Sequence, residues 1–436
     1  EISACLVGSE MCIRDRRYSM NSYESIFKEM GESARAASIV LQQLPEKRIN
    51  EVLCAIADAL VQHSEQILTA NHMDMDSARG VVPDTMLDRL QLSKERINQM
   101  AEGVRQVSLL PSPVGTILET INRPNGLHIE KRAVPFGVIG IIFEARPNVT
   151  VDAGALCFKT ANATILRGGK EAYRTNRVIV SIMQDVLEAN DLPRAAIQLV
   201  EVLDREAVSV LLQQRRYIDV VIPRGGAGLI QRVVRDSMIP VIETGSGVCH
   251  TYVDAEANID MAVDIAVNAK VQRPSVCNSM ETLLVHKSIA PKFLLALDSK
   301  LETHHVTIHG TPDVLQIVKG IAVDEHSFST EYNDLDLNVA IVSSVDEAIS
   351  HINQYTTHHS EAIVTDNMKT AQHFMNLIDC STVYHNASTR FTDGFEFGFG
   401  AEIGISTQKL HARGPMGLQA LTSYKYFVFG TGQIRS

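Results

Sequence analysis

Residues 138–143 read Val-Ile-Gly-Ile-Ile-Phe and residues 163–166 read Ala-Thr-Ile-Leu, and these two apolar runs decide the fold. Each has the length of a buried strand, and the segment between them, residues 151–161, is long and apolar enough for a helix. A strand, a helix and a second apolar strand are typical of a parallel sheet that helices cover on both faces. The chain is therefore predicted to be an α/β protein.

The alternation of helices and strands continues beyond this unit to about residue 385. Helices are expected at 171–189 and 205–213, and strands at 197–202, 217–222 and 240–243. Before residue 138 the chain is predicted to be helical from residue 20 to about residue 105. One of these helices has a single apolar face, formed by Ile49, Val52, Leu53, Ile56, Ala57 and Leu60.

A hairpin is predicted over about residues 120–129, because Asn125-Gly126 lies between two short β-prone runs. A hairpin between two larger regions is often an arm that joins subunits, and a simple surface hairpin is the alternative.

The first nineteen residues differ from the rest. They lack an initiator Met, mix Cys5 and Cys12 with arginines, and show no regular hydrophobic period. We expect residues 1–19 to be a non-native or disordered leader, with the natural start at Met20.

Composition excludes several classes of protein. A length of 436 residues suggests two or three domains, and a net charge of -11 argues against nucleic acid as a partner. No apolar run approaches the roughly 20 residues of a membrane helix. Seven scattered cysteines without a Cys-x-x-Cys pair favour a reducing compartment over a disulfide framework or a metal site, so a cytoplasmic protein is expected.

Two glycine-bearing turns lie where predicted strands lead into helices, at residues 167–170 and 223–228. Such turns place helix N-termini at the carboxyl edge of a sheet, where phosphates bind. Candidate contacts in the second turn are Gly225 and Gly226.

The first turn reads Arg167-Gly168-Gly169-Lys170, and no acidic residue ends the strand before it. Cations suit the 2′-phosphate of NADP(H), whereas a carboxylate suits the ribose of NAD(H). A dinucleotide at this turn would therefore be NADP(H). Two solvated residues at a helix start are the alternative interpretation.

Cys277 is predicted to lie in a polar loop, between a helix at 259–270 and a strand at 280–286. Arg273 precedes it by four residues, and a nearby cation favours the reactive thiolate. The alternative is a buried, inert thiol.

Glu243 precedes Cys277 in an order that resembles the aldehyde dehydrogenase superfamily. More narrowly, the chain from Met20 to about Arg435 resembles the gamma-glutamyl phosphate reductases. The matching stretches are residues 134–140, 144–150, 165–172, 222–226, 241–250, 271–279, 386–394 and 413–418.

The resemblance implies an aldehyde-dehydrogenase-like α/β fold with a Rossmann-like cofactor domain, an α/β catalytic domain and a small β element for oligomerisation. The expected domains are residues 20–118 with 136–246 for NADP binding and 247–419 for catalysis. Residues 119–135 with 420–436 would form the oligomerisation hairpin and strand of a homo-oligomer.

The resemblance also implies a reaction, the NADPH-dependent reduction of L-glutamyl 5-phosphate to L-glutamate 5-semialdehyde in proline biosynthesis. Cys277 would form a thioester, and its backbone N–H and the Asn148 amide would stabilise the oxyanion. Glu243 would activate the thiol or lie beside the nicotinamide. Its surroundings, Glu-Thr-Gly-Ser-Gly, depart from the Glu-Leu-Gly-Gly of hydrolytic relatives.

The implied substrate carries a phosphate and a carboxylate, which arginine binds bidentately. The candidates are Arg146, Arg273 and Arg390, each with a structural ion pair as its alternative role. Because the acyl phosphate is unstable, a transient complex with glutamate 5-kinase is expected. A hydrolytic aldehyde dehydrogenase and a catalytically silent scaffold remain the other readings of the sequence.

Overall fold

The computed structural model describes the backbone of residues 2–324 and 326–435 and the side chains from Ser22 to Arg435, except those of residues 84, 85 and 325. The side chains of the leader predicted at residues 1–19 lie outside this set. The chain divides into two compact units. The first comprises Glu1–Ile242, Phe399–Ile403 and Met416–Ser436, and the second comprises Glu243–Gly398 and Gly404–Pro415.

The first unit is built on a parallel sheet with the strand order β5-β4-β3-β6. Its strands are β3 (Val138–Phe143), β4 (Ala163–Arg167), β5 (Ile197–Leu199) and β6 (Val220–Arg224). The helices that alternate with them are α6 (Pro147–Lys159), α7 (Tyr173–Ala189), α8 (Arg205–Leu211) and α9 (Ala227–Asp236). The apolar runs at residues 138–143 and 163–166 both form strands, so the α/β prediction is confirmed.

The strands expected at 197–202 and 217–222 have other bounds, those of β5 and β6, and two further elements differ from the prediction for a clear physical reason. The helix expected at 151–161 begins at Pro147, because proline is favoured in the first helical turn, where its missing N–H leaves no bond unmade. The strand expected at 240–243 is reduced to a single bridge between Val221 and Val241. Pro240 has no N–H to donate to a longer ladder.

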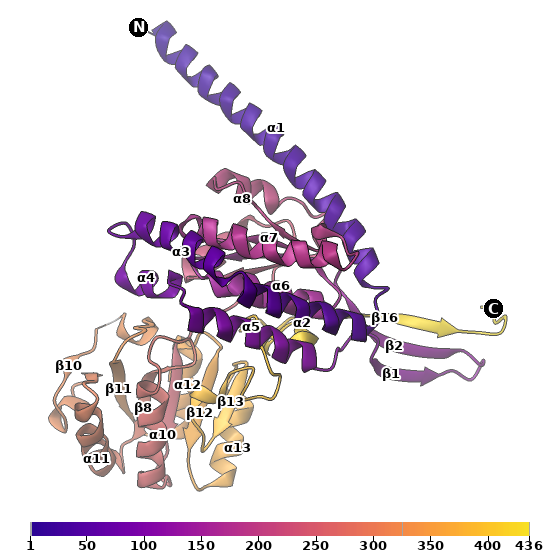
Figure 1. Ribbon diagram of the computed structural model, residues 1–436. Coiled ribbons are helices and arrows are strands. Elements are labelled where there is room, and N and C mark those ends of the chain that lie inside the picture. Colours follow the sequence, from indigo (N-terminus) through magenta and orange to yellow (C-terminus); the bar gives the residue numbers. More distant parts are fainter. Residues whose placement is uncertain (1, 325, 436) are drawn as a thin grey trace. The chain divides into compact units, whose positions relative to one another are not determined.

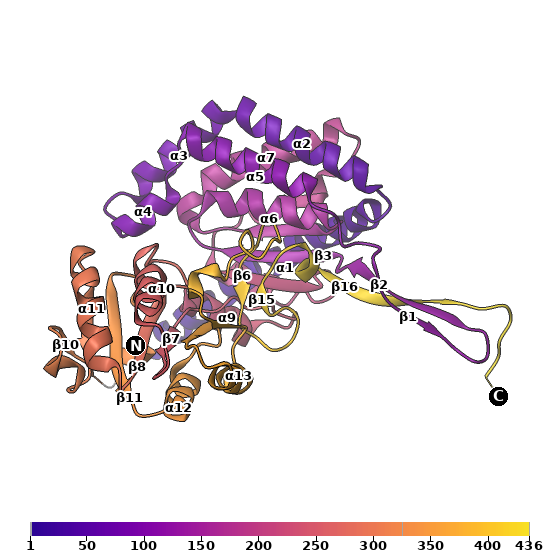
Figure 2. The ribbon, with the colours of Figure 1, turned by 90° about the horizontal axis from the view of Figure 1, so that it is seen from below.

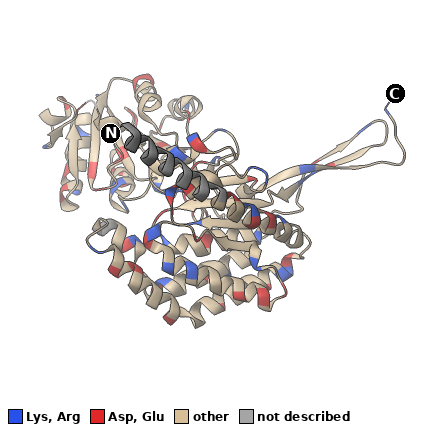
Figure 3. Ribbon diagram, turned by 90° about the horizontal axis from the view of Figure 1, so that it is seen from above, with Lys and Arg blue, Asp and Glu red and all other residues tan. Residues whose placement is uncertain are grey.

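Further helices precede these strands in the chain. They are α1 (Ile2–Leu41), α2 (Glu46–Gln62), α3 (Ser64–Ala78), α4 (Asp84–Leu90) and α5 (Lys94–Leu109). Helices α2, α3 and α5 form a layer over α6 and α7 (Figure 2), and the predicted apolar face of α2 is the face that is buried. Basic and acidic residues are interspersed along the ribbon (Figure 3). One exposed ion pair joins Arg105 of α5 to Asp58 of α2.

A separate antiparallel sheet of the first unit joins β1 (Ile117–Asn122), β2 (His128–Pro135) and β16 (Thr422–Phe429). Gly126 makes the turn between β1 and β2 with a φ of +88°, a conformation that favours glycine. The C-terminal strand β16 lies beside β2 along its whole length (Figure 1). The hairpin and the strand that were expected to pair therefore do so.

The second unit contains a seven-stranded parallel sheet with the order β10-β9-β11-β8-β7-β12-β13. Its strands are β7 (Cys249–Val253), β8 (Met280–His286), β9 (Thr307–Gly310), β10 (Ile321–Ala322), β11 (Asp336–Val342), β12 (Ser360–Val364) and β13 (Thr382–His385). Its helices are α10 (Ile259–Val271), α11 (Ala290–Thr303), α12 (Val345–Tyr355) and α13 (Met368–Leu377). A small pair, β14 (Ile405–Ser406) and β15 (Gly414–Pro415), completes it.

Apolar side chains line both faces of this sheet. Leu283 and Leu284, neighbours on the central strand β8, point to opposite faces and are both wholly buried. This core holds the carboxyl end of α10 and the start of β8 in fixed positions. Among the helices that the structure describes, none has the length and apolar character to cross a bilayer.

Candidate active site

Cys277 lies in a tight turn between α10 and β8, in the second unit, as the sequence predicts. The N–H of Ser279 donates to the carbonyl oxygen of Val276 at 3.0 Å, so Cys277 and Asn278 are the two central residues of the turn. Cys277 is half-buried, whereas Asn278 and Ser279 are buried. The thiol is therefore carried on a turn that the core of the unit anchors.

The main chain of Cys277 rests on the segment that leads into β7. A Cβ atom on Gly247 would lie 1.5 Å from the carbonyl oxygen of Cys277, so glycine is required there. The thiol of Cys249 donates to the same oxygen at 3.2 Å. The N–H of Gly247 donates to Glu331 Oε1 at 2.8 Å, which holds the supporting segment in turn.

A second segment is fastened to the turn through Asn278. Its Nδ2 donates to the carbonyl oxygen of Thr392 at 2.8 Å and to that of Arg390 at 3.3 Å. The hydroxyl of Thr389 donates back to the carbonyl oxygen of Asn278 at 2.8 Å. These bonds bring the 386–394 segment, with Arg390, beside Cys277.

A buried ion pair ties together the two elements that flank the turn. Lys270, in the last turn of α10, lies 2.8 Å from Glu281 on β8, and both side chains are buried. Burial raises the pKa of Glu281 to about 7, although Lys270 pulls that pKa down. Such a pair adds little net stability, because burying its two charges is costly. It does fix the geometry, because separating Lys270 from Glu281 would leave a buried charge unpaired.

The guanidinium group of Arg390 interacts electrostatically with Arg273 and with Cys277. Arg390 donates from Nε to Gln272 Oε1 at 2.8 Å. Burial lowers the pKa of Arg390, the charge of Arg273 lowers it further, and Asp393 and the Cys277 thiolate raise it. Two neighbouring guanidinium groups favour the thiolate and favour an anion bound beside it.

Glu243 is the first residue of the second unit. Its N–H donates to Gln408 Oε1 at 3.1 Å, and the following residues approach β14 through Gly245, whose N–H donates to the carbonyl oxygen of Ile405 at 3.2 Å. The main chain of Glu243 is thus fixed, while the chemical role of its carboxylate stays a prediction.

In the first unit, Arg167 ends β4 and bonds to nearby main chain. Its guanidinium donates to the carbonyl oxygens of Gly168 at 2.8 Å and Leu203 at 3.0 Å. Burial lowers the pKa of Arg167, Glu171 raises it, and Arg232 and Arg205 lower it. Arg205 and Arg232 were not among the predicted residues, because they lie on α8 and α9, far along the chain from Arg167.

Each of the two predicted phosphate turns contains a closely packed glycine, Gly168 in the first and Gly225 in the second. A Cβ on Gly168 would lie 2.3 Å from Asn176 Nδ2, and one on Gly225 would lie 2.6 Å from Glu144 Cδ. The N–H of Gly226 donates to Glu144 Oε2 at 3.1 Å. The backbone N–H that was expected to bind a phosphate therefore donates to a carboxylate of the chain itself. Glu144 was not among the predicted site residues, although it directly follows β3.

Asn148 lies in the first turn of α6, where its Nδ2 donates to Asp152 Oδ2 at 3.1 Å. Burial raises the pKa of Asp152 to about 6, and the Asn148 bond and Arg224 lower it. Arg146 is the N-cap residue of the same helix and, like Asn148 and Lys170, is exposed. The contacts of Arg146 and Lys170 do not test their predicted roles.

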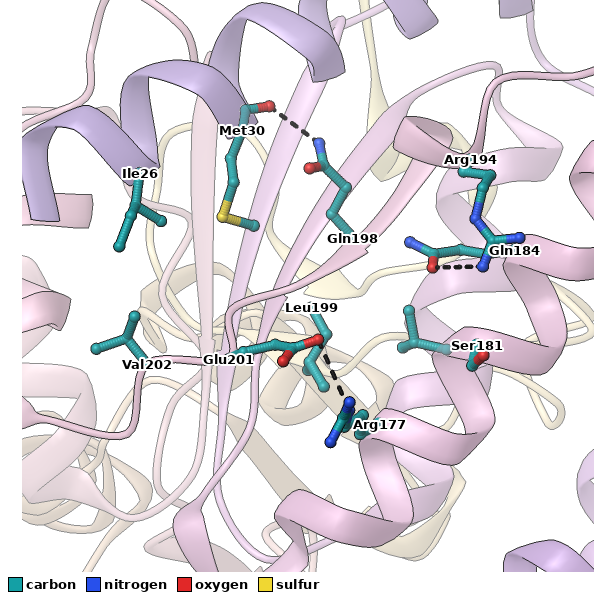
Figure 4. A pocket seen from close by; sticks show the side chains of 11 residues that line it. Ile26, Met30, Arg177, Ser181, Gln184, Arg194, Gln198, Leu199, Glu201 and Val202 are labelled. Carbon is teal, nitrogen blue, oxygen red and sulfur yellow. Dashed lines mark hydrogen bonds and ion pairs between the residues drawn. The ribbon is translucent and has the colours of Figure 1, made fainter.

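The first unit contains a cavity of about 500 Å³ between α1, α7 and the segment that includes and follows β5 (Figure 4). Gln198 donates to the carbonyl oxygen of Met30 at 2.9 Å, and Arg177 pairs with Glu201 at 3.8 Å. No predicted site residue lines this cavity. Among the described side chains, from Ser22 to Arg435 without residues 84, 85 and 325, no group of three or more His, Cys, Asp or Glu is placed to hold a metal ion.

Comparison with known proteins gives a consistent picture. Residues 20–316 match the model described as the aldehyde dehydrogenase family. A gamma-glutamyl phosphate reductase from Moorella thermoacetica is 53% identical over 407 residues, which cover 93% of this chain and 97% of that protein. One from Ligilactobacillus salivarius is 51% identical over 93% of this chain and 98% of its own. The crystal structure of the reductase from Thermotoga maritima matches with a TM-score of 0.92 at 43% identity, over 94% of this chain and 100% of that chain.

Proposed function

The chain belongs to the aldehyde dehydrogenase family and, within it, to the gamma-glutamyl phosphate reductases, and on that premise we propose that it converts L-glutamyl 5-phosphate and NADPH into L-glutamate 5-semialdehyde, phosphate and NADP through a thioester at Cys277. Reduction of glutamyl phosphate is a step of proline biosynthesis.

The observation that carries this proposal is the cation pair beside the thiol. An acyl phosphate is already activated, so the Cys277 thiolate can attack its carbonyl carbon without a metal ion, and phosphate leaves as the thioester forms. Arg273 and Arg390 would neutralise that phosphate, and the bond from Arg390 to Gln272 fixes the direction of its guanidinium. A hydrolytic dehydrogenase releases its acyl group to water and has no phosphate to bind.

The residues near β4 fit a nicotinamide dinucleotide that carries a 2′-phosphate. Burial lowers the pKa of Arg167, the charges of Arg232 and Arg205 lower it further against the opposing charge of Glu171, and Lys170 follows in the same turn. An anion with two charges would relieve this repulsion between cations. NADPH held there would supply the hydride that reduces the thioester, and Cys277 would then leave as a thiolate as the aldehyde is released.

Three assignments rest on family membership. We propose the Cys277 backbone N–H and the Asn148 amide as donors to the oxyanion, with a contribution of roughly 3 kcal/mol each. Arg146 is proposed as a ligand of the substrate carboxylate. Glu243 is proposed to activate the thiol or to lie on the nicotinamide side.

The chain is further proposed to form a homo-oligomer through the β1-β2-β16 sheet. Its edge strand β16 exposes about half the surface of Tyr424, Tyr426, Val428 and Phe429. An edge strand with apolar side chains is a template for pairing with a second copy. A transient complex with glutamate 5-kinase would protect the acyl phosphate during transfer.

The test is run in the reverse direction. NADP reduction is followed with glutamate 5-semialdehyde, with and without inorganic phosphate, for the wild type and Cys277→Ala. Turnover that requires phosphate and is lost in the variant supports the proposal. Turnover without phosphate would instead indicate a hydrolytic dehydrogenase, and no turnover in any arm would indicate a silent scaffold.

A further inference from the structure

A second cysteine holds the main chain of Cys277. Cys249 opens strand β7, is wholly buried, and donates its S–H to the carbonyl oxygen of Cys277 at 3.2 Å. The same oxygen lies against Gly247, where no side chain would fit. The carbonyl group is therefore enclosed between a glycine and a thiol.

The state of Cys249 suits a donor. Burial raises the pKa of Cys249, and the charges of Glu361 and Cys277 raise it further, so the thiol keeps its proton. The neighbouring imidazole of His359, whose Nδ1 lies 3.8 Å from Cys249 Sγ, is neutral because burial lowers its pKa to about 4. A protonated thiol beside a neutral ring can donate steadily to a carbonyl.

Three consecutive carbonyl groups of the turn accept hydrogen bonds. Val276 accepts from the Ser279 N–H, Cys277 accepts from Cys249, and Asn278 accepts from the Thr389 hydroxyl. Because a peptide unit is planar, fixing the oxygens on either side of Cys277 fixes both planes that meet at its Cα atom. The direction of its side chain and of its own N–H follows from those two planes.

We propose that Cys249 is a positioning residue, whose thiol fixes the peptide plane after Cys277 and thereby sets the direction of the Cys277 side chain relative to the plane before it, which the bond from Ser279 to Val276 holds. This inference rests on the proposed role of Cys277 as the nucleophile. Loss of the donor would let that plane rotate, so that the Cys277 sulfur no longer points steadily at the reacting carbonyl beside Arg273 and Arg390.

The test compares Cys249→Ala, which removes the donor, with Cys249→Ser, which keeps one. Cys380→Ala is a matched control, because Cys380 is also a buried thiol of this unit and donates to the carbonyl oxygen of Thr382 at 2.9 Å. Cys249→Val replaces the alanine variant if that variant does not fold. The rate of Cys277 alkylation by iodoacetamide is measured from pH 6 to 10 and mapped by mass spectrometry, alongside kcat and KM.

Cys249→Ala is expected to lower kcat and the alkylation rate about fivefold, the size of one net hydrogen bond, with an unchanged KM and an alkaline shift of the pH–rate profile. Cys249→Ser should restore most of both rates. An alanine or valine variant that matches Cys380→Ala in both measurements overturns the inference. Absence of phosphate-dependent turnover in the wild type would refute the proposed function alone, because the alkylation profile still decides the role of Cys249.

Discussion

Gly247 and Cys277 meet main chain to main chain. A Cβ atom on Gly247 would lie 1.5 Å from the carbonyl oxygen of Cys277 and 2.3 Å from its carbonyl carbon. No flexible side chain stands between them that could move aside, so any larger residue must displace the turn that carries the thiol.

Gly247→Ala is therefore expected to lower kcat about 100-fold, because a displacement near 1 Å at a reacting group costs about that factor. The assay is phosphate-dependent NADP reduction. Gly103→Ala is the control, because Gly103 lies inside α5 with no atom near its potential Cβ, and it should leave kcat unchanged. A Gly247→Ala enzyme with wild-type turnover would show that the turn does not hold the nucleophile.

Arg390→Gln is expected to raise the KM for phosphate about 30-fold, because a hydrogen bond between charged groups contributes about 2 kcal/mol. Arg390→Lys keeps the charge but loses the two parallel hydrogen bonds of a guanidinium group, so its KM for phosphate should lie between those of the wild type and Arg390→Gln. Initial rates at varied phosphate provide the measurement. Lys369→Gln, an exposed substitution on α13, should leave the KM unchanged, and an unchanged KM in Arg390→Gln would remove Arg390 from the phosphate site.

Asp152 predicts a pH dependence of stability. Its pKa is about 6 in the folded chain against an ordinary value of 3.8, so the folded state binds more protons between these values. The free energy of unfolding should therefore fall as the pH rises from about 4 to about 6. Asp152→Asn removes this loss and should be more stable than the wild type at pH 8 by about 3 kcal/mol.

Urea unfolding followed by circular dichroism at pH 4.5 and pH 8 measures this difference. Asp264→Asn, on an exposed position of α10, is the control and should not change the pH dependence. A wild-type chain that gains stability from pH 4.5 to pH 8 relative to Asp152→Asn would contradict the predicted sign.

Lys270→Met leaves Glu281 buried without its cation and is expected to destabilise the chain by about 3 kcal/mol at pH 8. The deficit should shrink below pH 6, because Glu281 then takes up a proton. The double variant Lys270→Met/Glu281→Leu should recover most of the stability, since it removes both charges. Thermal unfolding at the two pH values tests this, and equal losses at both would contradict it.

Much of the architecture could be predicted because it depends on short-range patterns. Apolar runs identified β3 and β4, helical spacing identified the buried face of α2, and the polar residues around Cys277 placed it between a helix and a strand. These signals need only the order of residues along a few turns of chain.

The contacts that support the candidate site were not predictable in the same way. Cys249 looks like an ordinary core residue of a strand, and its bond to Cys277 exists only because β7 pairs with β8. The bond from Gly226 to Glu144 likewise depends on the pairing of β3 with β6. Strand order is a long-range property, and no local pattern in the sequence states it.

The most direct test of the central claim is to trap the acyl enzyme. The wild type is mixed with glutamate 5-semialdehyde and NADP without phosphate, quenched in acid and digested for mass spectrometry. A glutamyl group attached to Cys277, removed when phosphate is added before the quench, is the predicted result. If NADP is reduced and no adduct is found, or the adduct is found on another residue, the result would contradict a thioester at Cys277.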